Sequence, residues 1–122
     1  MQITKFSKQL IDDTFDEYSV PRDYIEPIYN YLVHGYSPGA FFTAVLRNDW
    51  HGAITRSHPS NQIESLKRIS NWIYNYMPGQ AYGSDYAVNN WLSASDESRR
   101  IILEQNGLMY SSEEETIMAL RE

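Results

Sequence analysis

The stretch YSPGAFFTAVLRNDW, residues 36–50, decides how this chain folds. Its apolar run FFTAVL repeats with the spacing of one helix face, which is typical of a buried helix. Ser37 and Pro38 precede the run and are typical of an N-cap and a first helical position. The polar pair Asn48-Asp49 follows and favours a helix end. We therefore predict a short, mostly buried helix that starts at Pro38 and can extend as far as Ile54 if Gly52 is tolerated.

Apolar residues keep a helical spacing on both sides of this stretch. Upstream we expect a helix over residues 7–17, and a second helix that begins at Pro21, or nearer residue 26 because of Pro27, and ends at Gly35. Downstream we expect helices over residues 61–77, 84–92, 95–106 and 113–121. No segment alternates with a period of two for long enough to be a strand. The sequence thus predicts an all-α fold: a single compact domain over residues 1–122, an irregular bundle of six or seven short helices.

The downstream helices carry further signals in their capping and apolar residues. Two capping boxes are expected, one formed by Asn61 with Glu64 and the other by Ser112 with Glu115. The longest helix, 61–77, is expected to turn one face to the core, with the side chains of Ile63, Leu66, Ile69, Ile73 and Tyr76.

The chain is acidic, with a formal net charge of −6, and its charge is concentrated at the two ends. Residues 93–122 carry seven acidic against three basic side chains, and residues 1–20 are also acidic. Acidic surfaces repel phosphate backbones, so we expect no direct binding to nucleic acid, and the acids around Arg99-Arg100 leave no basic face. No cysteine is present, which excludes disulfides and thiolate metal sites. No apolar run suggests a signal peptide or a membrane span.

Candidate catalytic residues are few. Asp49, His51 and His58 could form an acid–base set, but Asp49 and His51 do not share a helix face. The three histidines, His34, His51 and His58, match no metal-binding spacing, and no nucleophile elbow or phosphate loop is present. We therefore assign no catalytic residue, no metal site and no cofactor. A hydrolase-type enzyme that uses Asp49, His51 and His58 is kept as an alternative.

Candidate binding residues fall into three groups. Asn48 and Asp49 either cap the next segment or form a polar patch for a partner. Glu113, Glu114 and Glu115 are either a charged first helical turn or an acidic contact surface. The third group is aromatic, because tyrosines often anchor interfaces; its members around the turn between two helices are Tyr74, Tyr82 and Tyr86.

Residues 34–91 resemble a pattern found in small proteins encoded by bacteriophages and prophages, with a Pro-Gly pair, an F-x-x-A-V-L-x-N-D run, a Y-N-x-x-P segment and a Gly-Ser turn before a Trp. The matching residues are Gly35, Pro38, Gly39, Phe41, Ala44, Val45, Leu46, Asn48, Asp49, Tyr74, Asn75, Pro78, Tyr82, Gly83, Ser84, Val88 and Trp91. Trp50 and Tyr82 depart from the usual residues, and the acidic segments 1–20 and 93–122 lie outside the pattern. The resemblance implies a phage-type origin and a bacterial host cytoplasm, but no activity.

These observations lead us to expect a non-enzymatic phage-type protein that binds, and inhibits, a host or phage protein. Acidic ends would steer it toward a basic surface, such as that of a nucleic-acid-binding protein, and aromatic residues would anchor it. A DNA-mimic form would require the acids to be ordered on one face. The alternatives are a self-assembling phage accessory protein, for example a homodimer, and the enzyme described above.

Overall fold

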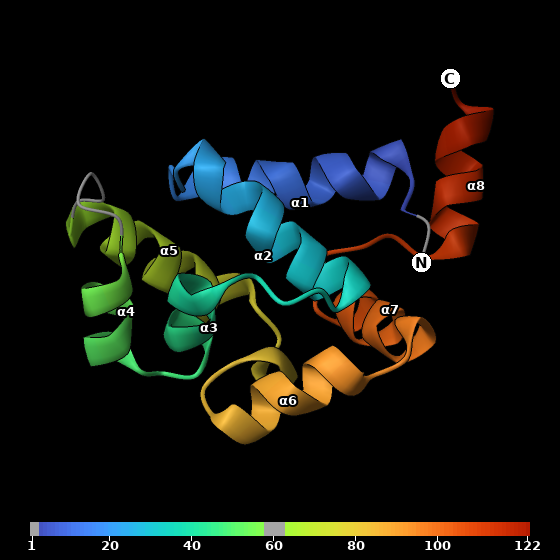
Figure 1. Ribbon diagram of the computed structural model, residues 1–122. Helices are drawn as coiled ribbons and strands as arrows, with labels where there is room; N and C mark the ends of the chain where they lie inside the picture. Colours follow the sequence, from blue (N-terminus) through green and yellow to red (C-terminus); the bar gives the residue numbers. More distant parts are fainter. Residues whose placement is uncertain (1–2, 58–62) are drawn as a thin grey trace.

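The computed structural model describes residues 3–57 and 63–122, and these ranges contain helices and turns without a strand (Figure 1). The all-α prediction is therefore confirmed. The helices of the described residues are α1 (Lys5–Glu17), α2 (Arg22–His34), α3 (Ala40–Leu46), α4 (Trp50–Arg56), α5 (Ile63–Tyr76), the 3₁₀ turn η1 (Gly79–Ala81), α6 (Asp85–Ser93), α7 (Asp96–Gln105) and α8 (Ser112–Leu120). This is one α-helix more than the upper prediction, because the stretch after Pro38 forms two helices.

Helix α3 begins later than its sequence signals indicate. Gly39, with φ +92° and ψ 170°, is the N-cap, and it makes no side-chain capping bond. This backbone conformation is not helical, so the predicted start at Pro38 with Ser37 as N-cap is wrong. The first helical residue is Ala40.

Helix α3 also ends before Gly52 is reached. Asn48 adopts φ +66°, and the N–H of Asp49 donates to the Ala44 carbonyl at 2.8 Å. This reversal is a Schellman motif, and it separates α3 from α4. The extension of one helix to Ile54 is therefore wrong. Ser19, with φ +54°, ends α1 in the same way.

Helix α2 contains a proline in its middle. It begins at Arg22 after Pro21, not near residue 26, and Pro27 lies inside it. Pro27 lacks the N–H that would have bonded to the carbonyl of Asp23, so one bond of the helix is missing. The helix tolerates this loss because its other face buries Ile28 and Leu32 completely.

Two tryptophans connect helices that are far apart in the sequence. Trp72 of α5 stacks on Phe15 of α1 at 4.4 Å between ring centroids, and its indole N–H donates to Thr14 Oγ1 at 3.0 Å. Trp91 of α6 donates in the same way to the Tyr31 carbonyl in α2, at 3.0 Å. Ile63 was expected in this core, but it is 84% exposed because it lies at the outer end of α5.

Arg99 is a buried cation that joins the ends of two helices. Its side chain is 4% exposed, and its guanidinium donates to the carbonyls of Val33 at 3.3 Å and His34 at 3.2 Å, where α2 ends. It also donates to the carbonyls of Trp91 and Ala94, where α6 ends. The guanidinium thus supplies donors to carbonyls at two helix ends, where the last carbonyls have no partner within the regular helix.

Gly35 makes room for this guanidinium. The predicted helix end at Gly35 is confirmed, with φ +68°. A Cβ at this position would lie 2.5 Å from Arg99 Nη1, which is closer than any normal contact. Two independent requirements, backbone conformation and space, therefore favour glycine here.

Candidate functional site

A cleft of about 800 Å³ lies between α3, the start of α4 and the turn that leads into α6. Among its lining residues are Gly39, Ala44, Asp49, Gly83 and Ser84, all of which belong to the phage-like sequence pattern. The Gly83 N–H donates to the Leu46 carbonyl at 2.7 Å and fixes the turn against the end of α3. The cleft is therefore built by segments that are distant in the sequence.

Arg47 forms one wall of the cleft. Its Nη2 donates to Asn89 Oδ1 at 3.1 Å, and its Nε lies 3.3 Å from Asp85 Oδ1. The Nε–Asp85 contact lacks the alignment of a hydrogen bond, and Nε is buried without another partner among the described residues. The guanidinium is held in place but is only partly satisfied.

Asp49 and Arg56 also line the cleft. Asp49 Oδ1 accepts the Gly52 N–H at 2.9 Å, so Asp49 is the N-cap of α4, as the structural interpretation predicts. Its Oδ2 lies 3.7 Å from Arg56 Nη1. Asn48 differs from that interpretation, because its side chain accepts the indole N–H of Trp50 at 2.7 Å instead of a backbone group.

A second hollow, a groove of about 640 Å³, lies between α1 and α2. Its walls carry the carboxylates of Asp12, Asp16 and Glu26, and its apolar lining includes Ile25 and Tyr29. Two cations, Lys8 and Arg22, also line the groove, and the Lys8 ammonium lies 6.0 Å from the centroid of the Tyr29 ring. We call these lining residues the α1–α2 groove.

The pKa values of two groove residues reflect this crowding. Partial burial raises the pKa of the Asp12 carboxyl; Lys8 opposes the rise, and Asp16 adds to it. Burial raises the pKa of the Tyr29 hydroxyl, and the charge of Asp12 raises it further. A cation brought into the groove would favour the charged form of Asp12.

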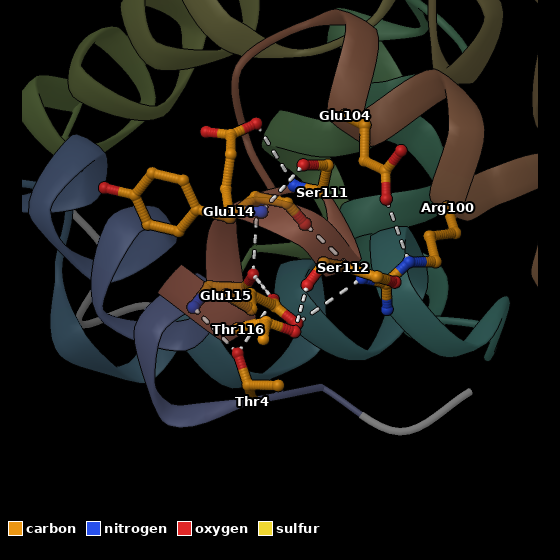
Figure 2. A network of polar contacts seen from close by, with 10 residues as sticks. Thr4, Arg100, Glu104, Ser111, Ser112, Glu114, Glu115 and Thr116 are labelled. Carbon is orange, nitrogen blue, oxygen red and sulfur yellow. Dashed lines mark hydrogen bonds and ion pairs between the residues drawn. The ribbon is translucent and has the colours of Figure 1, made fainter. Parts of the chain in front are cut away.

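Helix α8 stands at one end of the molecule beside the start of α1, and it buries none of its residues (Figure 1). Figure 2 shows how Glu115 attaches it: the carboxylate accepts from Thr4 Oγ1 at 2.8 Å and lies 3.6 Å from Arg100 Nη2. The buried hydroxyl of Ser7 also donates to Glu115. The attachment of α8 is therefore mainly polar.

The capping box of α8 lies one residue earlier than predicted. Ser111 is the N-cap and Glu114 its partner, so the assignment to Ser112 and Glu115 is wrong. This shift gives the three glutamates different surroundings. Glu113 and Glu114 are exposed, whereas the Glu115 side chain is 11% exposed and bound within the chain, so Glu115 does not fit the predicted contact surface.

The predicted aromatic group is also divided. Tyr74 and Tyr86 are 81% and 78% exposed, as an interface anchor requires, and they lie on α5 and α6. Tyr82 is half-buried and packs against the core, so it is less suited to this role.

The candidate catalytic residues have separate surroundings. His34 stacks on Tyr36 at 5.3 Å, while His51 is exposed on α4 and is not among the residues that line the cleft beside Asp49. His58 lies outside the described residues, and so does Asn61 of the other predicted capping box. Within residues 3–57 and 63–122, no three histidine, aspartate or glutamate side chains gather as a metal site would require. None of the helices described there is long and apolar enough to cross a membrane.

Sequence reasoning missed both hollows. The groove carries a readable signal, since Asp12 and Asp16 are four positions apart and share a helix face. The cleft carries none, because the positions of Arg47, Arg56 and Asp85 along the chain do not show that they meet. The comparisons add no name to either hollow: no family model matches the chain, and neither a curated protein nor a solved structure is significantly similar to it.

Proposed function

We propose that this chain is a non-enzymatic, phage-type binding protein that holds a basic segment of a host or phage protein in the α1–α2 groove. The phage-type origin rests on the sequence pattern of residues 34–91. The choice of a basic partner rests on one observation: three carboxylates and the Tyr29 ring line the same groove, these carboxylates outnumber its two cations, and the Lys8 ammonium already lies over the ring.

This arrangement is suited to a cationic side chain. The face of a tyrosine ring attracts an ammonium or guanidinium group, and nearby carboxylates provide charge-assisted hydrogen bonds. Within the chain, the Lys8 ammonium already lies over the Tyr29 ring as a bound cation would. Because the Lys8 side chain is exposed, a cation from a partner can displace it. The exposed rings of Tyr74 and Tyr86 provide aromatic anchors elsewhere on the surface.

Inhibition would follow from occlusion. The net charge of −6 speeds the encounter with a basic surface, and the bound chain then covers that surface. Because a cation lowers the pKa of Asp12, binding should weaken as the pH falls through the pKa of that carboxyl.

The test uses two triple variants that remove the same net charge from different places. Asp12→Asn, Asp16→Asn and Glu26→Gln neutralise the groove, whereas Glu97→Gln, Glu113→Gln and Glu114→Gln neutralise α7 and α8. Glutamine at position 114 preserves the capping box. Both variants are titrated by calorimetry with a short synthetic Lys/Arg-rich peptide, and both are used as baits in bacterial lysate.

We expect the groove variant to bind the peptide at least about tenfold more weakly, a loss of about 1.4 kcal/mol, and to lose a lysate protein that the other variant keeps. Equal weakening of both variants would show that the charge acts without a defined site and would contradict the proposal. Loss of binding in the α7–α8 variant alone would move the interface to Glu113 and Glu114.

A further inference from the structure

The two arginines of the cleft have unused hydrogen-bonding capacity. Each guanidinium carries several N–H donors in a fixed planar fork. Arg47 donates one hydrogen bond, to Asn89, while its buried Nε has no aligned acceptor in the described structure. Arg56 lies 3.7 Å from Asp49, a separation too long for a hydrogen bond. Both side chains line the same cleft.

The carboxylates beside them hold the guanidiniums without saturating them. Asp85 and Asp49 have side chains that are 77% and 53% exposed, so water satisfies much of their charge. Among the described residues neither carboxylate makes a hydrogen bond to its arginine, and this leaves N–H groups of each fork for a second acceptor. Arg47 is held in the cleft by its hydrogen bond to Asn89, and the more exposed Arg56 can turn toward a ligand in the same cleft.

The remaining lining is suited to a small polar ligand. Thr43, a polar residue four positions before Arg47, also lines the cleft. A Cβ at Gly39 or Gly83 would meet no atom within 4 Å, so the backbone here borders open space. A volume of about 800 Å³ is within the range of small-molecule sites.

We infer that this cleft is a binding site, separate from the α1–α2 groove, for the oxyanion of a small ligand, held between Arg47 and Arg56. The oxyanion is a carboxylate or a phosphate, because the planar fork of arginine matches both. Asp49 and Asp85 keep the net charge of the four side chains at zero, so the site favours a ligand that also carries a hydrogen-bond donor or a positive group.

The experiment is a titration of the ¹⁵N-labelled full chain at constant ionic strength, followed through the amide signals of Gly39 and Gly83. The probes are inorganic phosphate and glutarate, with chloride as the reference anion. Three variants are compared: Arg56→Gln, Arg47→Lys, and Arg68→Gln as the control. Arg68 is matched to Arg56 because it is also an exposed arginine paired with a carboxylate, that of Glu64, outside the cleft.

We expect at least one probe to shift both glycine signals to saturation, with chloride inactive. Arg56→Gln should raise the apparent Kd at least about tenfold, Arg47→Lys several-fold because it keeps the charge but loses the fork, and Arg68→Gln should leave it unchanged. Saturation by phosphate alone or by glutarate alone identifies the oxyanion. Shifts that do not saturate, that chloride reproduces, or that Arg68→Gln weakens as much as Arg56→Gln would overturn the inference.

Discussion

Arg99 and Arg100 are adjacent in the sequence, yet they attach two very different regions. Arg99 is 4% exposed and donates to backbone carbonyls at the ends of α2 and α6 as well as to the exposed carboxylate of Asp96. Arg100 is 22% exposed, pairs with Glu104 and Glu115, and donates to the Tyr110 carbonyl. Removing the first takes donors away from buried carbonyls. Removing the second leaves Glu115 its donors Thr4 and Ser7 and leaves Glu104 partly exposed to water. Arg99 therefore joins two core helices, α2 and α6, whereas Arg100 fastens the peripheral helix α8.

The largest effect is expected from Arg99→Met, which keeps much of the side-chain volume but removes every donor. We expect a loss of about 3–5 kcal/mol in the free energy of unfolding, since several buried carbonyls lose their partner. Urea unfolding followed by tryptophan fluorescence measures it. Arg100→Met is the matched control and should cost about 1 kcal/mol or less. Equal losses for the two variants would remove the distinction between the two arginines.

Gly35→Ala should come next, with a loss of at least about 1–2 kcal/mol from the left-handed conformation alone. The new Cβ would also displace the guanidinium of Arg99, 2.5 Å away. Part of this cost should therefore disappear in the Arg99→Met background. A double-mutant cycle measures that coupling, and strict additivity would contradict the close contact.

Alkaline pH should destabilise the core of the protein. Tyr31 is fully buried and its hydroxyl donates to the Ala81 carbonyl at 2.7 Å; burial raises the pKa of this hydroxyl above its ordinary value of 10.0. The tyrosine ionises at a lower pH in the unfolded chain than in the folded one. The contribution of Tyr31 to the free energy of unfolding is therefore full below about pH 10, and above that pH it falls by up to about 1.4 kcal/mol per pH unit. Urea unfolding from pH 9 to 11.5 should show a shallower decline for Tyr31→Phe than for the parent chain.

At the periphery, Glu115→Gln should loosen the attachment of α8 while helices α2 and α6 stay intact. The charge-assisted bonds to Thr4 and Ser7 weaken, a local loss of about 1 kcal/mol or more. Hydrogen exchange should show faster exchange of the α8 amides and unchanged exchange in α2 and α6. If all three helices exchanged faster together, α8 would belong to the same cooperative unit as the core.

The smallest effect is expected from Gly52→Ala, which also places a Cβ against an arginine. The nearest atoms are Asp49 Oδ2 at 2.2 Å and Arg56 Nη1 at 2.3 Å. Both belong to exposed side chains that can move, and alanine favours the helix by up to about 1 kcal/mol, so we expect a net change within about 0.5 kcal/mol. A large loss on thermal unfolding would show that the Asp49 cap cannot adjust.

Local signals predicted local structure well. The helices expected to start at residues 84 and 95 do so, with Ser84 and Ser95 as their N-caps, and Gly35 lies at a helix end as expected, because each of these signals depends on nearby backbone groups. The α8 capping box could not be placed, since Ser111 and Ser112 each have a glutamate three positions later. The contacts of Glu115 with α1 distinguish the two, and those are tertiary.

The candidate sites show the same limit. That Asp49 is a cap could be expected from its place after an apolar run, whereas the burial of Arg99 and the exposure of Arg100 cannot be read from two adjacent arginines. Their environments depend on where α2 and α6 end in space. Both hollows also arise from the packing of helices. Among their lining residues, only Asp12 and Asp16 have a sequence spacing that indicates a shared helix face.

The tryptophan contacts also bear on how the chain reaches its structure. The indole bonds of Trp72 and Trp91 join residues 58 and 60 positions apart, and Arg99 reaches across 66 positions to Val33. A helical protein usually folds fast because its contacts are local, but these contacts require long loops to close first. Residues from both halves of the chain form one core, so the first half cannot reach its final packing before the second half has been synthesised.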